Sequence, residues 1–273
     1  MVISELISSI KSELTDNSAF EAREIVAAAL GMDKSGLIIR AKESVDDVSA
    51  KRAYEMLERR KNGEPLQYIL GAAEFMSLEF EVNPYTLIPR SDTETLVEEI
   101  IKRVGNKNVS ILDIGTGTGC IGISLGKYLT NAKITLADIS EGALGTAKRN
   151  AKNNGVSVEI LHLDILTEIP KGRYDIVVSN PPYIQSQVIP TLQTEVKDYE
   201  PMTALDGGED GLIFYRRIVE IAPDLLNENG ILAFEIGYDQ GEELMGLMSN
   251  EFKNVEIIKD LCGNDRVAIG DKK

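Results

Sequence analysis

The chain has 273 residues, enough for one large or two ordinary domains, and its apolar content of 43% suffices for a folded core. The net charge of −15 is opposite to the basic footprint of proteins that bind duplex nucleic acid, whereas an acidic surface suits a basic protein partner. We find no apolar run long enough to span a membrane and no signal peptide, and therefore expect a cytoplasmic protein. The two cysteines, Cys120 and Cys262, argue against a disulfide framework, and no Cys/His cluster has the spacing of metal ligands.

The first part of the chain is predicted to be helical. Apolar residues recur at helical spacing from Ile3 to Leu14, a second segment runs from Ala19 to Leu30, and a third begins near Asp46 and ends at Asn62. We therefore predict a small N-terminal helical-bundle domain over residues 1–72. It carries no chemical motif and is a candidate docking domain or a purely structural one.

Residues 73–90 change to a partial alternation of apolar and polar side chains, which predicts a β-hairpin that links two domains. Directly after it, Ser91 and Glu94 have the spacing of a capping box ahead of an apolar helix pattern. We assign Thr93 and Glu94 to the cofactor site. The alternative is a well-capped helix with no further role.

A predicted strand from Val109 to Ile114 runs into a glycine-rich loop and then into an apolar helix pattern. Strand, glycine loop and helix form the nucleotide-binding βα turn, in which glycines let the backbone approach a ligand closely. A dinucleotide-binding loop needs a third glycine where this chain has Cys120, which disfavours a dehydrogenase and favours S-adenosylmethionine, a ligand without a pyrophosphate. The loop residues assigned to the cofactor are Gly115, Thr116, Gly117, Thr118 and Gly119.

Acidic residues end the next two predicted strands. Asp138 follows the strand that begins at Lys133, at a place where a carboxylate can accept both hydrogens of a ribose diol. The alternative for Asp138 is a helix cap. Asp164 and Ile165 follow a strand that begins at Val158 and would flank an adenine, so we assign Asp138, Ile139, Asp164 and Ile165 to the cofactor.

The apolar run from Tyr174 to Val178 predicts a buried strand, and the prolines that follow it cannot continue that strand. The prolines therefore terminate the strand with a rigid segment at its carboxyl end, and open α/β sheets bind ligands at this end of their strands. The Asn180 side-chain oxygen and the Pro181 carbonyl can grip one planar –NH2 group beside a flat aromatic face. The residues assigned to catalysis are Asn180, Pro181, Pro182 and Tyr183, with Asn180 also assigned to the cofactor; the alternative is a proline-rich turn with a buried tyrosine.

A long irregular stretch over residues 184–211 follows, which suggests part of a substrate groove. A helix, a strand, a second helix and two final strands complete the pattern. The alternation predicts an α/β fold of the Rossmann-like type, with a seven-stranded, mostly parallel sheet whose last strands form a hairpin.

With these segments placed, the chain resembles the protein-(glutamine) methyltransferases of the HemK/PrmC family, which modify peptide chain release factors. The likeness covers nearly the whole chain, and several of its motifs lie outside the general methyltransferase pattern. The motifs are Pro65-Leu66-Gln67-Tyr68-Ile69, Leu87-Ile88-Pro89-Arg90, Asp92-Thr93-Glu94, Asp113 to Cys120, Ala137-Asp138-Ile139-Ser140, Ser179-Asn180-Pro181-Pro182-Tyr183-Ile184, Glu200-Pro201, Gly207-Gly208, Asp210-Gly211 and Asp265-Arg266-Val267.

The resemblance implies that residues 91–273 form a class I methyltransferase domain dependent on S-adenosyl-L-methionine, with S-adenosyl-L-homocysteine as product. The implied substrate is the side-chain amide nitrogen of the glutamine in the Gly-Gly-Gln motif of class I peptide chain release factors. We expect a monomer with no direct nucleic-acid or membrane binding. The chain departs from the family pattern at Ser91, where members usually have proline, and at Ile165, where some place an aromatic residue.

The main alternative is an adenine amino-group methyltransferase acting on DNA or RNA, because an exocyclic amine is also a planar –NH2 group. The acidic charge and the lack of a basic, aromatic-rich segment argue against it. A binding protein that keeps the cofactor fold as an interaction platform is a second alternative. The intact residues of the glycine loop, Asp138 and Asn180 disfavour it.

Overall fold

The computed structural model describes residues 1–15 and 18–273, and no helix among them is long and apolar enough to cross a membrane. The contacts divide the chain into two units. The first comprises residues 1–71 together with 193–199, and the second comprises residues 72–192 and 200–273. The segment 73–90, predicted as a link between domains, is therefore part of the second unit.

The first unit is helical, and the three helices predicted from apolar spacing are confirmed. Two further helices, of six and five residues, are too short to show a helical period in the sequence. The core of this unit contains Leu6, Ile25 and Leu57, each essentially inaccessible to solvent. Its helices are α1 (Ile3–Glu13), α2 (Ser18–Leu30), α3 (Lys34–Ile39), α4 (Asp47–Lys61), α5 (Leu66–Leu70) and, from the distant segment, α9 (Thr194–Lys197).

Ion pairs around Arg60 attach this distant segment to the helices of the first unit. The Arg60 guanidinium donates to both carboxylate oxygens of Glu21, at 2.7 and 2.9 Å, and to the carboxylate of Glu195. The Tyr199 hydroxyl donates to the carbonyl oxygen of Asn62 at 3.0 Å. Because the Arg60–Glu21 pair is largely shielded from water, its attraction is less screened than that of a surface pair.

The second unit contains the predicted seven-stranded sheet, which is mostly parallel and ends in an antiparallel hairpin. The strand order is β5-β4-β3-β6-β7-β9-β8, so the order reverses between β3 and β6. A separate antiparallel hairpin is formed by β1 (Ala72–Phe75) and β2 (Leu78–Glu81). The strands of the large sheet are β3 (Ser110–Ile114), β4 (Lys133–Asp138), β5 (Val158–His162), β6 (Tyr174–Ser179), β7 (Leu226–Glu235), β8 (Phe252–Lys259) and β9 (Asp265–Lys272).

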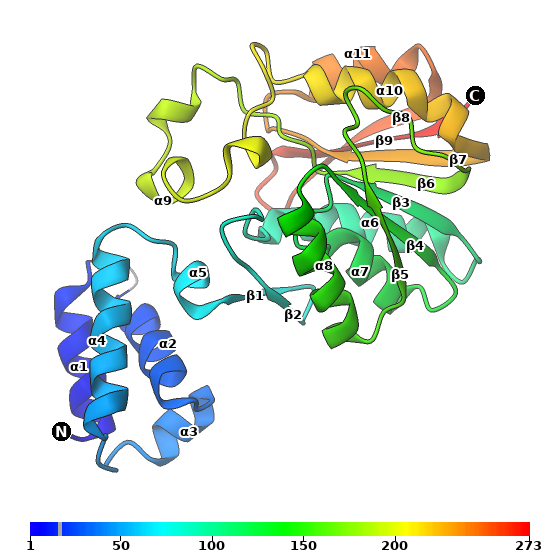
Figure 1. The fold of residues 1–273 in the computed structure, drawn as a ribbon. Helices are drawn as coiled ribbons and strands as arrows, with labels where there is room; N and C mark the ends of the chain where they lie inside the picture. The colour runs from blue at the N-terminus through cyan, green and yellow to red at the C-terminus, as the bar shows by residue number, and fades with distance from the viewer. Residues whose placement is uncertain (16–17) are drawn as a thin grey trace. The chain divides into compact units, whose positions relative to one another are not determined.

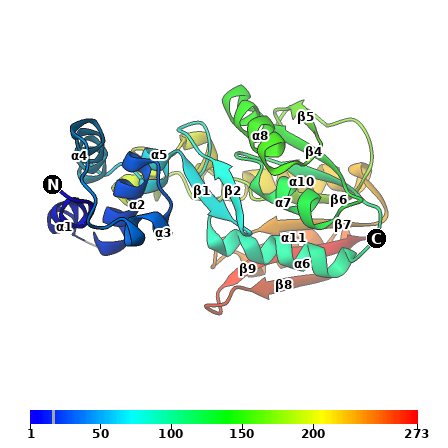
Figure 2. The same ribbon diagram turned by 90° about the horizontal axis from the view of Figure 1, so that it is seen from below.

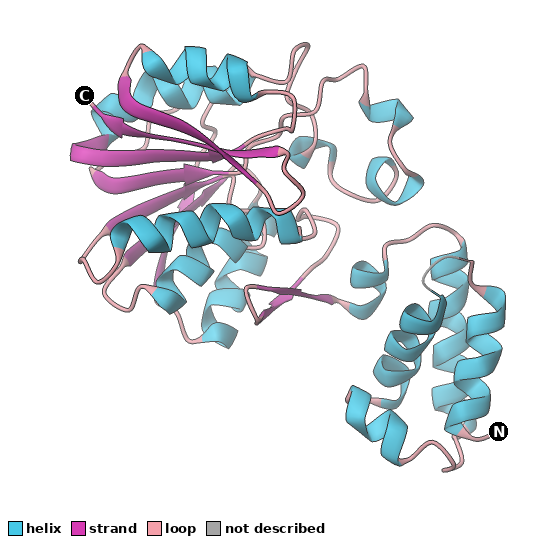
Figure 3. Ribbon diagram, turned by 180° about the vertical axis from the view of Figure 1, so that it is seen from behind, coloured by secondary structure: helices cyan, strands magenta, loops and turns pink. Residues whose placement is uncertain are grey.

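Helices cover both faces of this sheet, and each face has its own hydrophobic core (Figure 1, Figure 2). One face carries α6 (Glu94–Val104), α7 (Cys120–Tyr128) and α8 (Glu141–Asn154), and the other carries α10 (Ile213–Leu225) and α11 (Gly241–Ser249). Figure 3 shows the sheet as the middle layer between the two helical layers. Because the central strands are buried on both faces, they are mostly apolar and show no alternation of apolar and polar residues, with Asp113 and Asp175 as the charged exceptions.

The predicted capping box at Ser91 and Glu94 is wrong. Residues Ser91–Thr93 form a short 3₁₀ turn, η1, and no side chain caps α6. The Glu94 carboxylate instead accepts a hydrogen bond of 2.6 Å from the backbone amide of Met76, at the tip of the β1–β2 hairpin. Met76 and Ser77 both have positive φ there, and the tight turn leaves this amide available to a tertiary partner.

The close approach of α7 to the sheet depends on Gly122. A Cβ atom at this position would overlap the Leu136 side chain and lie 3.1 Å from Asp113 Oδ2. We expect Gly122→Ala to lower the free energy of unfolding by about 1–3 kcal/mol, the usual penalty for overpacking. Urea denaturation measures this change.

The matched control is Gly246→Ala in α11, where a Cβ atom would meet nothing within 4 Å. This substitution should raise the free energy of unfolding by about 0.5–1 kcal/mol, because glycine is a poor helix former. Equal stability of the two variants would contradict the close packing of α7.

Candidate active site

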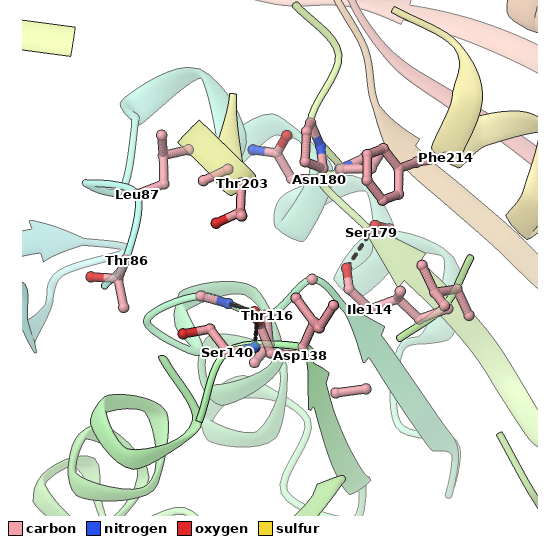
Figure 4. A pocket seen from close by; sticks show the side chains of 18 of the residues that line it. Thr86, Leu87, Ile114, Thr116, Asp138, Ser140, Ser179, Asn180, Thr203 and Phe214 are labelled. Carbon is pink, nitrogen blue, oxygen red and sulfur yellow. Dashed lines mark hydrogen bonds between the residues drawn. The ribbon is translucent and has the colours of Figure 1, made fainter. Parts of the chain in front are cut away.

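A cavity of about 410 Å³ opens at the carboxyl ends of β3, β4 and β6, where the strand order of the sheet reverses. Open α/β sheets bind their ligands at such a point, and the volume falls in the range of small-molecule sites. Figure 4 shows side chains from several elements directed into this space.

The glycine loop forms one wall, and a buried carboxylate holds it in place. Asp113 Oδ2, at the end of β3, accepts hydrogen bonds from the Thr116 hydroxyl at 2.6 Å and from the Gly122 amide at 3.0 Å. Burial raises the pKa of Asp113 to about 6, although both hydrogen bonds favour the charged form. Gly115 and Gly117 have positive φ, which turns the loop sharply after the strand.

Asp138, at the end of β4, faces the same cavity and is oriented by two backbone amides. The Gly117 amide donates to Oδ2 and the Ser140 amide donates to Oδ1, each at 2.9 Å. Burial raises the pKa of Asp138, and these two hydrogen bonds act against that rise. A carboxylate oxygen can accept more than one hydrogen bond, so both oxygens keep acceptor capacity for a ligand.

The segment Asn180-Pro181-Pro182-Tyr183, called the acceptor motif below, closes the opposite side of the cavity. The Ser179 hydroxyl donates to the Ile114 carbonyl at 2.6 Å, which ties the end of β6 to the end of β3. Asn180, Pro181 and Pro182 then line the cavity. The amide nitrogen of Asn180 is 3.5 Å from the hydroxyl oxygen of Thr93, where η1 ends and α6 begins.

Tyr183 does not line this cavity but packs among the core residues behind the motif. Its hydroxyl donates to Glu235 Oε1 at 3.5 Å, and its backbone carbonyl accepts a hydrogen bond of 3.4 Å from the Gln240 side chain. Burial and the nearby carboxylate of Glu235 raise the pKa of Tyr183 well above its usual range. This tyrosine is therefore a neutral hydroxyl that anchors the motif to β7.

The stretch that follows the motif folds back on it. The Ile184 amide donates to the Leu205 carbonyl at 3.0 Å, and the Gly207 amide donates to the Ile184 carbonyl at 2.8 Å. Through this return the stretch contributes Met202, Thr203, Ala204 and Asp206 to the cavity wall. A Cβ atom on Gly207 would lie only 2.7 Å from the Tyr183 Cα, so only glycine fits against the motif there.

The cavity brings together most of the residues that the sequence assigns to the site. Gly119, Glu94 and Tyr183 are not among the residues that line it. Gly119 instead precedes α7 and packs against Ile123. The assigned residues that line the cavity are Thr93, Gly115, Thr116, Gly117, Thr118, Asp138, Ile139, Asp164, Ile165, Asn180, Pro181 and Pro182.

Several lining residues were not assigned from the sequence. Leu87, Pro89 and Arg90 occur in a motif that carries the family resemblance, which was the available signal. For Phe214 and Ile218 the only signal is the apolar face of α10, which also fits a plain core helix. The lining residues not assigned from the sequence include Tyr85, Thr86, Leu87, Pro89, Arg90, Met202, Thr203, Ala204, Asp206, Phe214 and Ile218.

The sheet topology and the position of the cavity define a class I methyltransferase fold. Solved structures agree, although at sequence identities that show the fold alone. A methyltransferase from Pyrococcus furiosus aligns with a TM-score of 0.53 at 21% identity, over 80% of this chain and 98% of that chain. The catalytic domain of hMettl16, in complex with MAT2A 3'UTR hairpin 6, aligns with a TM-score of 0.55 at 17% identity, over 82% of each chain.

Sequence comparison is more specific. Residues 2–71 match the PrmC N-terminal domain, and residues 91–196 match the Methyltransferase small domain. The release factor glutamine methyltransferase of Geobacter sulfurreducens is 41% identical over 93% of this chain and 90% of its own length. That of Clostridium botulinum is 40% identical over 90% of this chain and 89% of its own. The chain belongs to the release factor glutamine methyltransferase family.

The fit of Gly207 against the acceptor motif gives a test that leaves the cavity residues unchanged. Gly207→Ala should push the Pro182–Tyr183 backbone away and lower kcat for methyl transfer by about 10²-fold, since a displacement near 1 Å can have that effect. Single-turnover kinetics with a release factor measures it.

Gly145→Ala in α8 is the control, because the nearest neighbour of its Cβ atom would be 3.6 Å away, an ordinary contact. Equal kcat in the two variants would argue that the packing of Gly207 does not set the geometry of the motif.

Proposed function

We propose that this protein transfers a methyl group from S-adenosyl-L-methionine to the side-chain amide nitrogen of the glutamine in the Gly-Gly-Gln motif of class I peptide chain release factors. The observation that carries the proposal is that Asn180 and the two prolines share one cavity with the glycine loop and Asp138. The curated relatives support a protein substrate over an adenine amino group, because they are named release factor glutamine methyltransferases.

The residues of the cavity suit the cofactor. The Asp138 carboxylate, fixed by the Gly117 and Ser140 amides, would accept hydrogen bonds from the ribose hydroxyls. Ile139 and Ile165 would hold the adenine by dispersion contacts, with Asp164 and Thr93 among the polar groups at the wall. When bound, S-adenosyl-L-methionine supplies a methyl group that is already activated by its sulfonium. Gly119 and Glu94 would support the loop and the start of α6 from outside the cavity.

Asn180 and the prolines would position the substrate amide. Pro181 and Pro182 have no N–H, so the carbonyls of the motif are not committed to local hydrogen bonds. The Asn180 side-chain oxygen and the Pro181 carbonyl would accept the two hydrogens of the glutamine –NH2 and aim its nitrogen at the methyl group. Orientation of this kind can supply about 7–11 kcal/mol of the barrier.

We assign no general base to the reaction. In the proposed transfer the amide nitrogen would bond to the methyl carbon that S-adenosyl-L-methionine supplies, and the electron pair of the methyl–sulfur bond would go to sulfur. The proton lost from nitrogen passes to solvent afterwards. The two acceptors favour the positive charge that builds up on nitrogen, which is electrostatic stabilisation without proton transfer.

The proposal also assigns a role to each of three segments of the chain. Residues 1–72 would dock the release factor, the β-hairpin region 73–90 would connect this domain to the rest, and residues 91–273 would carry the reaction. Release factors would be the macromolecular partner, which suits the net charge of −15 if the contacting surface of the partner is basic.

Asn180→Ala tests the gripping role directly. It should lower kcat by about 10²–10³-fold, the scale of losing one preorganised contact, while the cofactor Kd changes much less. Mass spectrometry of a release factor incubated with enzyme and cofactor, beside a nucleic-acid control, measures methylation of the glutamine.

Gln187→Ala is the matched control, because this exposed amide lies outside the cavity in the same loop. A near-normal kcat for Asn180→Ala would remove the gripping role. Methyl label in the nucleic acid, with none on the protein, would favour the adenine alternative.

Asp138→Ala tests the cofactor assignment. We expect mainly weaker binding of S-adenosyl-L-methionine, because the ribose loses a charged acceptor, and calorimetry measures the Kd. Glu159→Ala on the neighbouring strand β5 removes an exposed carboxylate outside the cavity and should leave the Kd unchanged. An unchanged Kd in Asp138→Ala would count against the ribose contact.

A further inference from the structure

Glu235, the last residue of β7, is a buried carboxyl that the reaction described above does not use. Only 2% of its surface is exposed, and it is not among the residues that line the cavity. Its Oε1 accepts the hydrogen bond from the Tyr183 hydroxyl, and its Oε2 has no hydrogen-bond partner among the described residues. Burial raises the pKa of Glu235 to about 7.

A carboxyl in this place is unfavourable for stability alone. Burying an incompletely paired carboxylate is costly, and an apolar side chain of similar size would avoid that cost. Nor is Glu235 needed to neutralise Arg266, whose guanidinium already pairs with Asp92 at 3.3 Å and with Asp260 at 3.2 Å. The carboxyl therefore requires another explanation.

The side chains around the Glu235 carboxyl supply it, because three of them belong to or contact the acceptor motif. The Tyr183 hydroxyl donates to Oε1, whereas the Thr93 hydroxyl and the Asn180 amide lie beside the carboxyl outside hydrogen-bond geometry and lower the pKa that burial raises. Thr93 and Asn180 also lie within 3.5 Å of each other. The Glu235 carboxyl is thus placed behind the motif, on the side away from the cavity.

An ionised carboxylate only accepts hydrogen bonds, whereas an asparagine side chain has an accepting end and a donating end. The structure places the Asn180 amide nitrogen toward Thr93 and Glu235. If the Asn180 side chain turned over, its oxygen would face the carboxylate and its –NH2 would face the substrate. The carboxylate disfavours this reversed state. In it the Asn180 oxygen would meet the Glu235 carboxylate, and the Asn180 –NH2 would meet the –NH2 of the substrate glutamine.

We propose that Glu235 is a positioning residue that fixes the orientation of Asn180, so that the Asn180 oxygen faces the substrate amide. The proposal rests on the gripping role proposed for Asn180. It extends that role to a side chain that touches neither substrate nor cofactor.

Activity and stability should then depend on pH in opposite directions. Only the ionised form of Glu235 enforces the orientation, so kcat should rise as the pH increases through about 7. The pKa of Glu235 is higher in the folded than in the unfolded protein, so the free energy of unfolding should fall as the pH rises from about 4.5 to about 7. The titratable groups that face Glu235 from other elements are Tyr183 after β6, Arg266 on β9, Asp92 in η1, Tyr215 on α10 and Cys120 on α7.

The test is a double-mutant cycle between Asn180→Ala and Glu235→Leu, read as single-turnover methylation of a release factor. Glu235→Leu alone should lower kcat by about 10- to 100-fold, the scale of losing a group that orients a ligand, with the cofactor Kd unchanged. The double variant should have a kcat less than about twofold below that of Asn180→Ala alone, because the effects of substituting residues that act as a unit are not additive.

Glu235→Gln keeps the size of the side chain and guards against a folding defect. Its own –NH2 can donate to a reversed Asn180, so kcat should fall, and its dependence on pH near 7 should flatten. The Tm at pH 8 should equal or exceed that of the unmodified protein, because a buried charge is removed. Glu228→Gln, an exposed position on the same strand, should change none of these values.

The possible failures are distinct. A kcat within twofold of normal for Glu235→Leu, an equal loss in the Asn180→Ala background, or an unchanged pH profile in Glu235→Gln would each overturn the positioning role. If Asn180→Ala itself retained normal kcat, the gripping role would fall and this inference with it. If Asn180→Ala is impaired while the Glu235 variants are not, only the inference is overturned.

Discussion

The hydrogen bond from the Ser179 hydroxyl to the Ile114 carbonyl joins the ends of β6 and β3 at the point where the strand order reverses. Immediately beyond it, two prolines prevent β6 from continuing into the sheet. The carbonyls that follow are therefore held at the sheet edge without local partners. This constraint places an acceptor motif and a glycine loop on two sides of one cavity, and the remaining contacts of the site support that arrangement.

Buried carboxyls at the carboxyl ends of β3, β4 and β7 provide much of this support. Asp113 holds the glycine loop, Asp138 is held by that loop and by the start of α8, and Glu235 stands behind the acceptor motif. Burial raises the pKa of each of them. Such groups reduce the stability of the fold, and the geometry that they impose on a ligand site is the compensating gain.

Local sequence patterns were enough to predict most helices and strands, but they predicted the wrong partner for Glu94. Helical periodicity located the main helices, and short apolar runs bounded by turn residues located the seven strands of the sheet, because burial leaves a pattern that can be read without the fold. Helical periodicity missed α3 and α5, which are shorter than two helical turns. Glu94 has the spacing of a cap but binds the Met76 amide, since a hairpin tip distant in sequence offers a donor that local spacing does not reveal.

The sequence by itself determined the chemistry available at the sheet edge: the glycine loop, Asp138 and the Asn-Pro-Pro-Tyr motif follow strands, and parallel strands bring their ends together. Only the tertiary structure decided that Tyr183 points into the core, that Phe214 lines the cavity and that Glu235 lies behind Asn180. The physical reason is that a strand pattern gives alternation along the chain, whereas the partner of a buried polar group depends on which elements pack against it.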